Sequence, residues 1–216
     1  MRLFKEAEQA LHYDGPPIER IVSEILENVR IGGDRAVLDY GEKFDGFRPR
    51  SIRIADDVVK AAYSKVEPDT ITNLRFAADR ITDFARHQRA SMHELRYEIS
   101  PGVTLGHRLI PVGSCGCYVP AGRYPLPSSA LMSIIPAKVA GVGRIAAASP
   151  ASRGADGIHP AILAAMDIAG ADEVYCMGGA QAIGAFAFGT ESIMPIDIIA
   201  GPGNRYVTEA KRQVSG

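Results

Sequence analysis

Several features that would mark common functional classes are absent from this sequence. The 216 residues include no tryptophan and only three cysteines, and the formal net charge is −1. A near-neutral chain without a basic tail or stripe argues against nucleic acid and anionic membranes as partners. The longest apolar stretches are shorter than a membrane span and are interrupted by Gly, Pro or Lys. Because the first residues mix charged and apolar types, unlike a signal peptide, we expect a soluble, cytoplasmic protein.

Disulfide and metal-binding patterns are also missing. The cysteines are odd in number and lack disulfide or zinc-finger spacing, so we expect them to pack inside strands. The five histidines share no i, i+4 spacing that would make a local pair of metal ligands on a helix. We therefore expect no metal site within this chain. The residues concerned are Cys115, Cys117, Cys176, His12, His87, His93, His107 and His159.

The charged residues that are present are distributed unevenly. Of the 49 charged residues, 34 lie in residues 1–100. Such a charge-rich segment is typical of solvated helices, whereas the charge-poor remainder is typical of elements buried on several sides. We predict a mainly helical region over residues 1–102, forming part of a substrate domain and of a subunit interface. A Rossmann-like domain is predicted over residues 103–216.

Apolar residues at helical spacing predict the helices of the first region. A helix beginning at Pro16 and Pro17 carries Ile residues at spacings of three and four, and Gly32 and Gly33 are expected to end it. Asp34 is a candidate cap for the helix that follows. A short strand and a further helix are predicted within residues 51–66, and a long helix is predicted to end near Arg89.

Strand-like and helix-like segments alternate in the second region. The strands are predicted at "CGCYVP", "RIAAAS", "EVYCM" and "IDIIA", with helices between them and after the last one. Strands that are apolar on both faces indicate a parallel sheet covered by helices on both sides. Right-handed crossovers then predict an α/β fold: an incomplete Rossmann-like parallel sheet with helices on both faces. The first of these helices starts at Ser128 and contains Pro136, which is expected to kink it.

Three loops at the predicted carboxyl edge of the sheet combine glycines with one polar side chain each. They are "YVPAGRYPLPSS" with Tyr118, "MGGAQ" with Gln181 and "AGPGN" with Asn204. Glycines allow close approach of the backbone, and helix N-termini offer N–H groups to phosphate. The usual dinucleotide motif G-x-G-x-x-G is absent. From the residues alone, the three loops indicate a nucleotide or another phosphate-bearing ligand at this edge.

The segments "GCYVPAGRYPLPSSALMSIIPAKVAGV", "GGAQAIGAFAFGTE" and "GPGNRYVTEAKRQVSG" together resemble histidinol dehydrogenase. Upstream, "GDRAVLDYGEKFDGF" and "RITDFARHQR" are similar to that family's N-terminal region in the same order. The resemblance implies an NAD-dependent, zinc-dependent enzyme, usually a homodimer. Such an enzyme oxidises L-histidinol through the aldehyde to L-histidine, the last step of histidine biosynthesis. It also implies NAD contacts at Tyr118, Gln181 and Asn204.

Two departures from the family pattern accompany this resemblance. Family members are about twice this length, and their "AGPSE" segment, zinc ligands and Glu-His base follow the point where this chain stops. The chain is therefore expected to be a fragment or a truncated product that alone binds no catalytic zinc and oxidises no alcohol. In addition, "YVPAG" stands where histidinol enzymes usually have "YVPGG".

Two alternative functions follow from these departures. The segment "LGHRLIPVGSCGCYVPAGRY" also resembles the branch of the family that oxidises sulfopropanediol. A non-catalytic NAD-binding module is the other alternative, since the catalytic segments cannot be mapped onto this chain. Histidinol dehydrogenase is the reading that we favour, with a small-molecule alcohol as the substrate.

Overall fold

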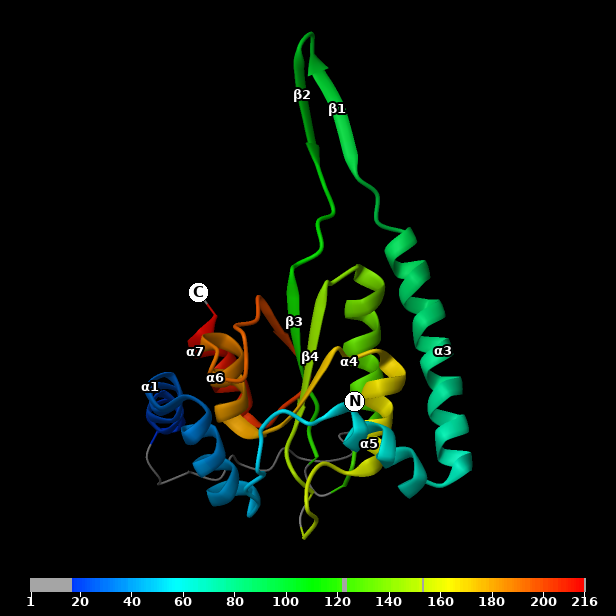
Figure 1. Ribbon diagram of the computed structural model, residues 1–216. Helices are drawn as coiled ribbons and strands as arrows, with labels where there is room; N and C mark the ends of the chain where they lie inside the picture. Colours follow the sequence, from blue (N-terminus) through cyan, green and yellow to red (C-terminus); the bar gives the residue numbers. More distant parts are fainter. Residues whose placement is uncertain (1–16, 122–123, 153, 216) are drawn as a thin grey trace, which may run out of the picture.

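The computed structural model describes residues 17–121, 124–152 and 154–215, and a parallel sheet lies at its centre (Figure 1). Helices precede the sheet in the chain and alternate with its strands. In chain order the elements are α1 (Ile18–Asp45), α2 (Asp56–Ala62), the short 3-10 helix η1 (Tyr63–Lys65), α3 (Pro68–Ala90), β1 (Leu95–Ser100), β2 (Val103–His107), β3 (Ser114–Tyr118), α4 (Pro127–Ala140), β4 (Arg144–Ser149), α5 (Pro160–Ala169), β5 (Glu173–Cys176), α6 (Gly179–Phe188), β6 (Ile198–Ala200) and α7 (Arg205–Val214).

The sheet has the strand order β5-β4-β3-β6, and all its neighbouring strands are parallel. In the register, Cys115 of β3 lies between Ile145 of β4 and Ile198 of β6. The order reverses between β3 and β6, and such a switch point is where open α/β sheets bind ligands, outside the carboxyl ends of the strands. The predicted α/β fold with a helical N-terminal region and a helix-flanked parallel sheet is confirmed.

Alternation along the strands divides the core into two layers. Cys115 and Cys117 belong to the cluster on the side of α4 and α5, whereas Tyr118 belongs to the cluster on the side of α6. All five residues of β3 are buried. This two-sided burial is the physical reason that the strands read as apolar on both faces.

Helices from the first part of the chain cover both faces of this sheet. α1 packs against α6 and α7, while α3 packs against α4 and α5. α1 is interrupted at Gly33, whose φ of 52° and ψ of −138° are accessible to glycine and strained for other residues. The predicted break at this glycine is therefore confirmed. Asp34 accepts hydrogen bonds from the Ser192 backbone N–H and hydroxyl, and thereby ties the second part of α1 to the loop before β6.

The short strand predicted near residue 53 is present as a single bridge. Arg53 pairs antiparallel with Tyr175, and the neighbouring Ile54 N–H donates to the Val174 carbonyl at 2.8 Å. The first region therefore adds one backbone segment to the β5 edge of the sheet. α4 includes Pro136 and continues past it to Ala140.

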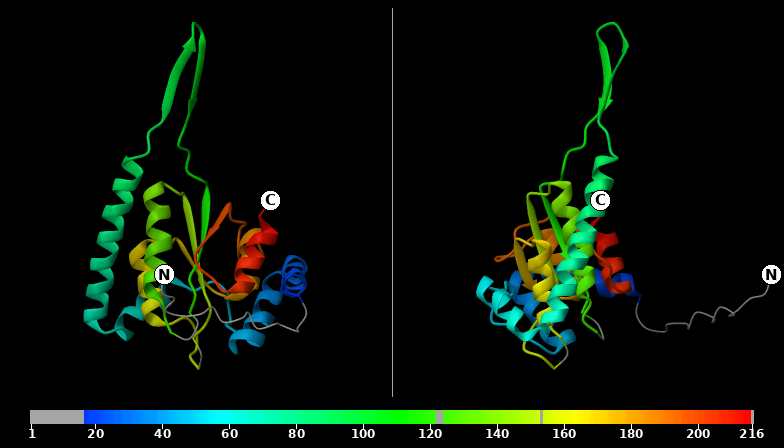
Figure 2. Two further views of the ribbon diagram at one scale, coloured as in Figure 1. Left: turned by 180° about the vertical axis from the view of Figure 1, so that it is seen from behind. Right: turned by 90° about the vertical axis from the view of Figure 1, so that its right-hand side faces the viewer.

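A two-stranded hairpin extends away from this body and was not anticipated from the sequence (Figure 2). β1 and β2 pair antiparallel, and every residue of both strands is exposed. Gly102, the last residue of the predicted first region, lies in the turn between the two strands. The division at that residue into a substrate domain and an NAD domain stays a prediction.

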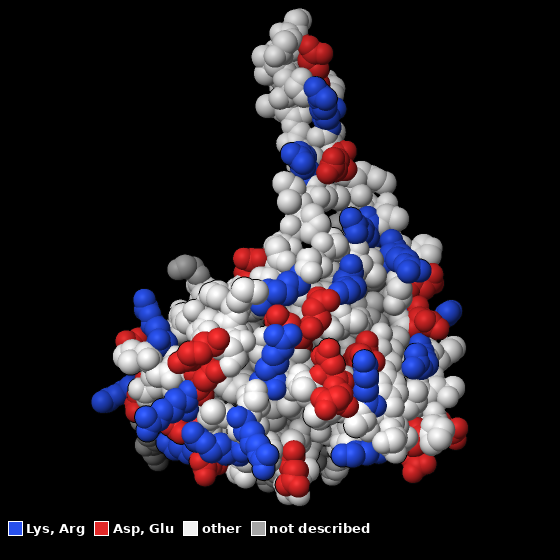
Figure 3. All heavy atoms as spheres, in the orientation of Figure 1, with Lys and Arg blue, Asp and Glu red and all other residues white. Residues whose placement is uncertain are grey.

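The charged side chains of the body are mixed in sign on the face shown in Figure 3. Acidic and basic groups alternate over the helices there, and the hairpin carries both signs as well. Among the helices that the structure describes, none combines the length and the apolar character needed to cross a bilayer.

Candidate functional site

Tyr118 ends β3 and its side chain lies at the start of α6. The ring is buried, and its hydroxyl accepts a hydrogen bond from the Gly179 backbone N–H at 3.1 Å. Burial raises the pKa of the phenol, the hydrogen bond from Gly179 lowers it, and the negative charge of Asp45 raises it. Since the net direction is upward, the hydroxyl stays neutral at physiological pH and can act as donor and acceptor.

Gln181 lies in the first turn of α6, next to the same glycine. Only 1% of the residue is exposed, and neither its Nε2 nor its Oε1 has a hydrogen-bond partner among the described residues. Gly179 has a φ of 64°, and a methyl group added there would lie 2.6 Å from Gln181 Oε1. The glycine is therefore required both by its backbone conformation and by the amide that lies over it. A buried amide without partners is costly and calls for an explanation.

Asn204 lies at the N-terminus of α7 and caps that helix. Its Oδ1 accepts from the backbone N–H groups of Tyr206 and Val207, at 3.0 and 3.1 Å. The residue is exposed, unlike Tyr118 and Gln181. The loop that leads to it starts directly against β3, because a side chain at Gly201 would overlap the Tyr118 carbonyl. The structure thus brings Tyr118 and Gln181 together at Gly179 and engages the Asn204 side chain in its own helix.

An acidic residue, Asp45, also lies at this edge, and the sequence motifs did not indicate it as a site residue. It is the last residue of α1, and a methyl group at Gly178 would lie 3.2 Å from its Oδ2. Burial raises the pKa of Asp45 to about 6. The residues next to Asp45 in the sequence, "EKF", do not predict that it lies beside α6, because α6 is far away along the chain.

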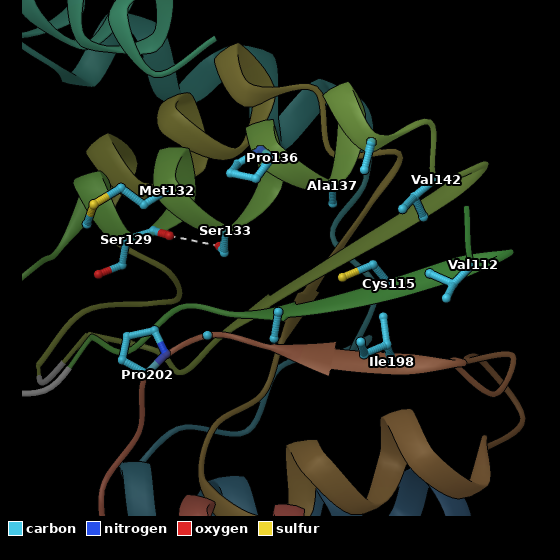
Figure 4. A pocket seen from close by; sticks show the side chains of 13 residues that line it. Val112, Cys115, Ser129, Met132, Ser133, Pro136, Ala137, Val142, Ile198 and Pro202 are labelled. Atoms are coloured by element: carbon cyan, nitrogen blue, oxygen red, sulfur yellow. Dashed lines mark hydrogen bonds between the residues drawn. The ribbon is translucent and has the colours of Figure 1, made fainter. Parts of the chain in front are cut away.

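A separate apolar pocket lies between α4 and the sheet (Figure 4). Its volume is about 460 Å³, and it is bounded by side chains of β3, α4 and β6. Cys115 points from β3 toward α4, where the Ser133 hydroxyl donates to the Ser129 carbonyl at 2.8 Å. None of the predicted ligand residues lines this pocket. We place the candidate site at Gly179 instead, because the unpartnered polar groups are there.

The described cysteines are buried within the fold, and one histidine caps a helix. All three cysteines are buried and form no disulfide, as expected for residues packed in strands. His159 accepts from the Ala161 backbone N–H at 3.2 Å and so caps α5. His12 lies outside the described residues. Within the described ranges, no group of three or more His, Cys, Asp or Glu residues is placed to hold a metal ion.

Comparison with known proteins agrees with the resemblance read from the motifs. The family model described as histidinol dehydrogenase matches residues 10–216. "Histidinol dehydrogenase homolog 1" of Mesorhizobium japonicum is 46% identical over 195 residues, which are 90% of this chain and 39% of that protein. Histidinol dehydrogenase of Chlorobaculum tepidum is 45% identical over 202 residues, 93% of this chain and 46% of that protein.

A solved structure gives the same result in three dimensions. The crystal structure of histidinol dehydrogenase from Elizabethkingia anophelis superposes with a TM-score of 0.86 at 35% identity. It covers 95% of this chain, and the chain covers 47% of it. The chain spans less than half the length of these relatives. Because the family model spans nearly all of its residues and the fold agrees with a solved member, this chain belongs to the histidinol dehydrogenase family.

Proposed function

We propose that this chain is the NAD-binding part of an alcohol dehydrogenase of the histidinol dehydrogenase type. The observation that carries the proposal is the unpartnered amide of Gln181 at the N-terminus of α6. A buried amide that is left without partners in the protein can be satisfied by a ligand. It lies at the carboxyl edge of a parallel sheet, where nucleotides bind in folds of this class.

The residues present fit a dinucleotide. Gln181 offers a donor and an acceptor, and Gly179 lets this amide lie directly over the first turn of α6. Tyr118 presents a neutral hydroxyl that accepts the Gly179 N–H of the same turn. Helix N-termini in general suit a phosphate. Asn204 would reach the cofactor through the loop that adjoins Tyr118. NAD, when bound, would supply the acceptor for the hydride that leaves the alcohol carbon.

The described residues do not fit zinc, which the family resemblance also implies. The described part of the chain holds no group of three or more potential ligands. Zinc sites use about four, or three and a water. We propose that the 216 residues bind NAD without oxidising an alcohol, and that zinc chemistry requires segments corresponding to the rest of the relatives' length.

Fluorescence titration of the purified chain with NADH tests cofactor binding directly. The chain has no tryptophan, so nicotinamide emission can be followed without interference from indole. We expect saturable binding that is lost in Gln181→Ala and retained in Gln88→Ala, which changes an exposed glutamine of α3. Absence of NADH binding by the parent chain would contradict the proposal.

The substrate is tested with the complete gene product. NADH formation is measured with histidinol and with sulfopropanediol, before and after zinc chelation. Preference for histidinol supports the favoured function. Preference for sulfopropanediol supports the alternative branch, for which the "YVPAG" segment with its buried Ala121 is the favouring feature. If the protein binds NADH but oxidises neither compound, the result supports a non-catalytic NAD-binding module.

We also propose that the protein is a homodimer and that the β1–β2 hairpin contributes to the interface. An isolated two-stranded hairpin is marginally stable in water. This one exposes the apolar side chains of Leu95, Tyr97, Ile99, Val103 and Leu105. Light scattering would show a dimer for the parent chain and a folded monomer after residues 95–107 are replaced by a short Gly-Ser linker.

A further inference from the structure

The Asp45 carboxylate has no structural partner in the described part of the chain. No hydrogen bond or ion pair joins it to a described residue, and burial alone accounts for its raised pKa. Glu42 of the same helix is instead paired with Arg48 at 3.3 Å. Asp45 also ends α1, where the helix dipole is negative and an additional anion is unfavourable. A half-buried carboxylate in this position costs stability, which makes it a candidate for a functional group.

The carboxylate faces the turn that the candidate site uses. A methyl group at Gly178 would lie 3.2 Å from Asp45 Oδ2 and 2.5 Å from Pro150 Cβ, so the acid sits beside the loop that follows β4. Its charge contributes, after burial, to the raised pKa values of Tyr118 and Cys176. Asp45 therefore lies outside the carboxyl ends of β4 and β5, at the entrance to α6.

Capping of α6 does not explain the position of this residue. The N-cap of α6 is Gly178, and no side chain bonds the first turn there apart from the Tyr118 hydroxyl. A cation site does not explain it either, because no second and third acidic, His or Cys ligand accompanies it among the described residues. What remains is an acceptor group beside Gly178, one residue before the glycine over which the orphaned Gln181 amide lies.

The chemistry that matches an ionised carboxylate at a nucleotide site is a pair of neighbouring hydroxyl groups. A ribose diol donates two hydrogen bonds to one carboxylate, and in dinucleotide-binding sheets an acidic residue commonly performs this role. A phosphate on the 2′ oxygen would instead bring a second negative charge against the acid. We propose that Asp45 is a specificity residue of the cofactor site, which accepts the 2′ and 3′ hydroxyls of a ribose and disfavours a 2′-phosphorylated dinucleotide. This inference rests on the proposed function.

The groups around Asp45 leave it as the residue that titrates near neutrality. Tyr118 has a raised pKa, and burial raises the pKa of Cys176 to about 12, so both stay neutral below pH 8. Gln181 does not ionise, and α6 contains no charged residue. On its own helix, Lys43 lies over the rings of the half-buried Tyr40 and the exposed Phe44, and Glu42 accepts a hydrogen bond from Arg48. A change in cofactor affinity between pH 5 and pH 8 that is absent in Asp45→Asn therefore reports on the Asp45 carboxylate.

The experiment compares NADH and NADPH binding to the purified chain by fluorescence titration at pH 7.5. Asp45→Asn removes the charge with almost no change in size. We expect NADH to bind at least about tenfold more weakly, because hydrogen bonds to an ionised acceptor are lost. The preference for NADH over NADPH should fall by a similar factor. Glu42→Gln, which removes one negative charge three residues earlier in α1, should change both affinities less than about twofold.

A pH series adds a second readout. The parent chain should lose NADH affinity as the pH falls below about 6, whereas Asp45→Asn should be flat over the same range. Circular dichroism confirms that each variant is folded, and Asp45→Ser replaces Asp45→Asn if the latter is not. If the parent binds NADH and the Asp45 variants bind it with the same affinity and the same preference over NADPH, this inference is overturned and the proposed function is left intact. A parent chain that binds no NADH would overturn both.

Discussion

The hydroxyl of Tyr118 accepts the Gly179 backbone N–H, and so joins the end of β3 to the first turn of α6 across 61 residues of sequence. Gly179 begins α6, the helix that connects β5 to β6. It holds the tyrosine ring and the orphaned Gln181 amide at one glycine. The candidate site is thus positioned by a side chain at the end of β3 and by the helix that follows β5.

Tyr118→Phe tests this connection. The variant leaves the buried ring in place and removes the acceptor of the Gly179 N–H. We expect the free energy of unfolding to fall by about 1 kcal/mol, measured by urea denaturation, and NADH binding to weaken. Tyr97→Phe, which removes an exposed hydroxyl on the hairpin, serves as the control. Equal stability of the two variants would show that the bond contributes nothing.

Gln181→Met separates stability from ligand binding. Methionine has nearly the shape of glutamine and has no amide that needs partners in a buried position. We expect the free energy of unfolding to rise by about 1 kcal/mol and NADH affinity to be lost. A variant that is less stable than the parent would indicate that the amide is satisfied within the protein, contrary to the structure.

Asn204 is tested with two substitutions because it has both a structural and a predicted cofactor role. Asn204→Ala removes the acceptor for the Tyr206 and Val207 N–H groups and should cost about 1 kcal/mol of stability. Asn204→Asp retains the acceptor, so it should unfold like the parent. If the amide also contacts NAD, NADH titration will show weaker binding for both variants. Full affinity in Asn204→Asp would limit the residue to capping.

Gly116→Ala tests the packing of β3 against α6. The added methyl group would lie 2.8 Å from Cδ2 of the buried Phe186 ring. We expect a loss of about 1–3 kcal/mol in the free energy of unfolding, because neither the strand nor the ring has room to move. The double variant with Phe186→Leu should lose less than the two single changes together. Additive losses would argue against this contact.

The stability of the parent chain and of Asp45→Asn should depend differently on pH. Because the folded pKa of Asp45 is about 6 and the ordinary value is 3.8, the folded state holds this proton more tightly. Ionisation between about pH 4 and pH 6 therefore lowers the stability of the parent. Thermal unfolding should show Asp45→Asn to be the more stable protein at pH 7.5, with the difference shrinking as the pH falls and disappearing below about pH 4. A constant difference across this range would contradict the assignment.

The sequence was sufficient for the sheet, whereas the ligand edge inferred from its loops stays a prediction. Apolar strands alternating with helices predicted the parallel sheet, since burial on both faces leaves a pattern that is local in the chain. The break at Gly33 was also predictable, because it depends on the residue's own backbone and its nearest neighbours. The family motifs pointed to Tyr118, Gln181 and Asn204, and that functional assignment stays a prediction.

Tertiary structure decided which groups at that edge have partners. The sequence alone does not show that Gln181 is left without hydrogen bonds, that Asn204 is occupied in capping, or that Asp45 of α1 borders the start of α6. The sequence analysis predicted no strands over residues 95–107, and only the fold shows a hairpin there that no described residue covers. Periodicity records burial along one element, whereas hydrogen bonding and the cost of an unpaired charge depend on atoms that distant segments bring together.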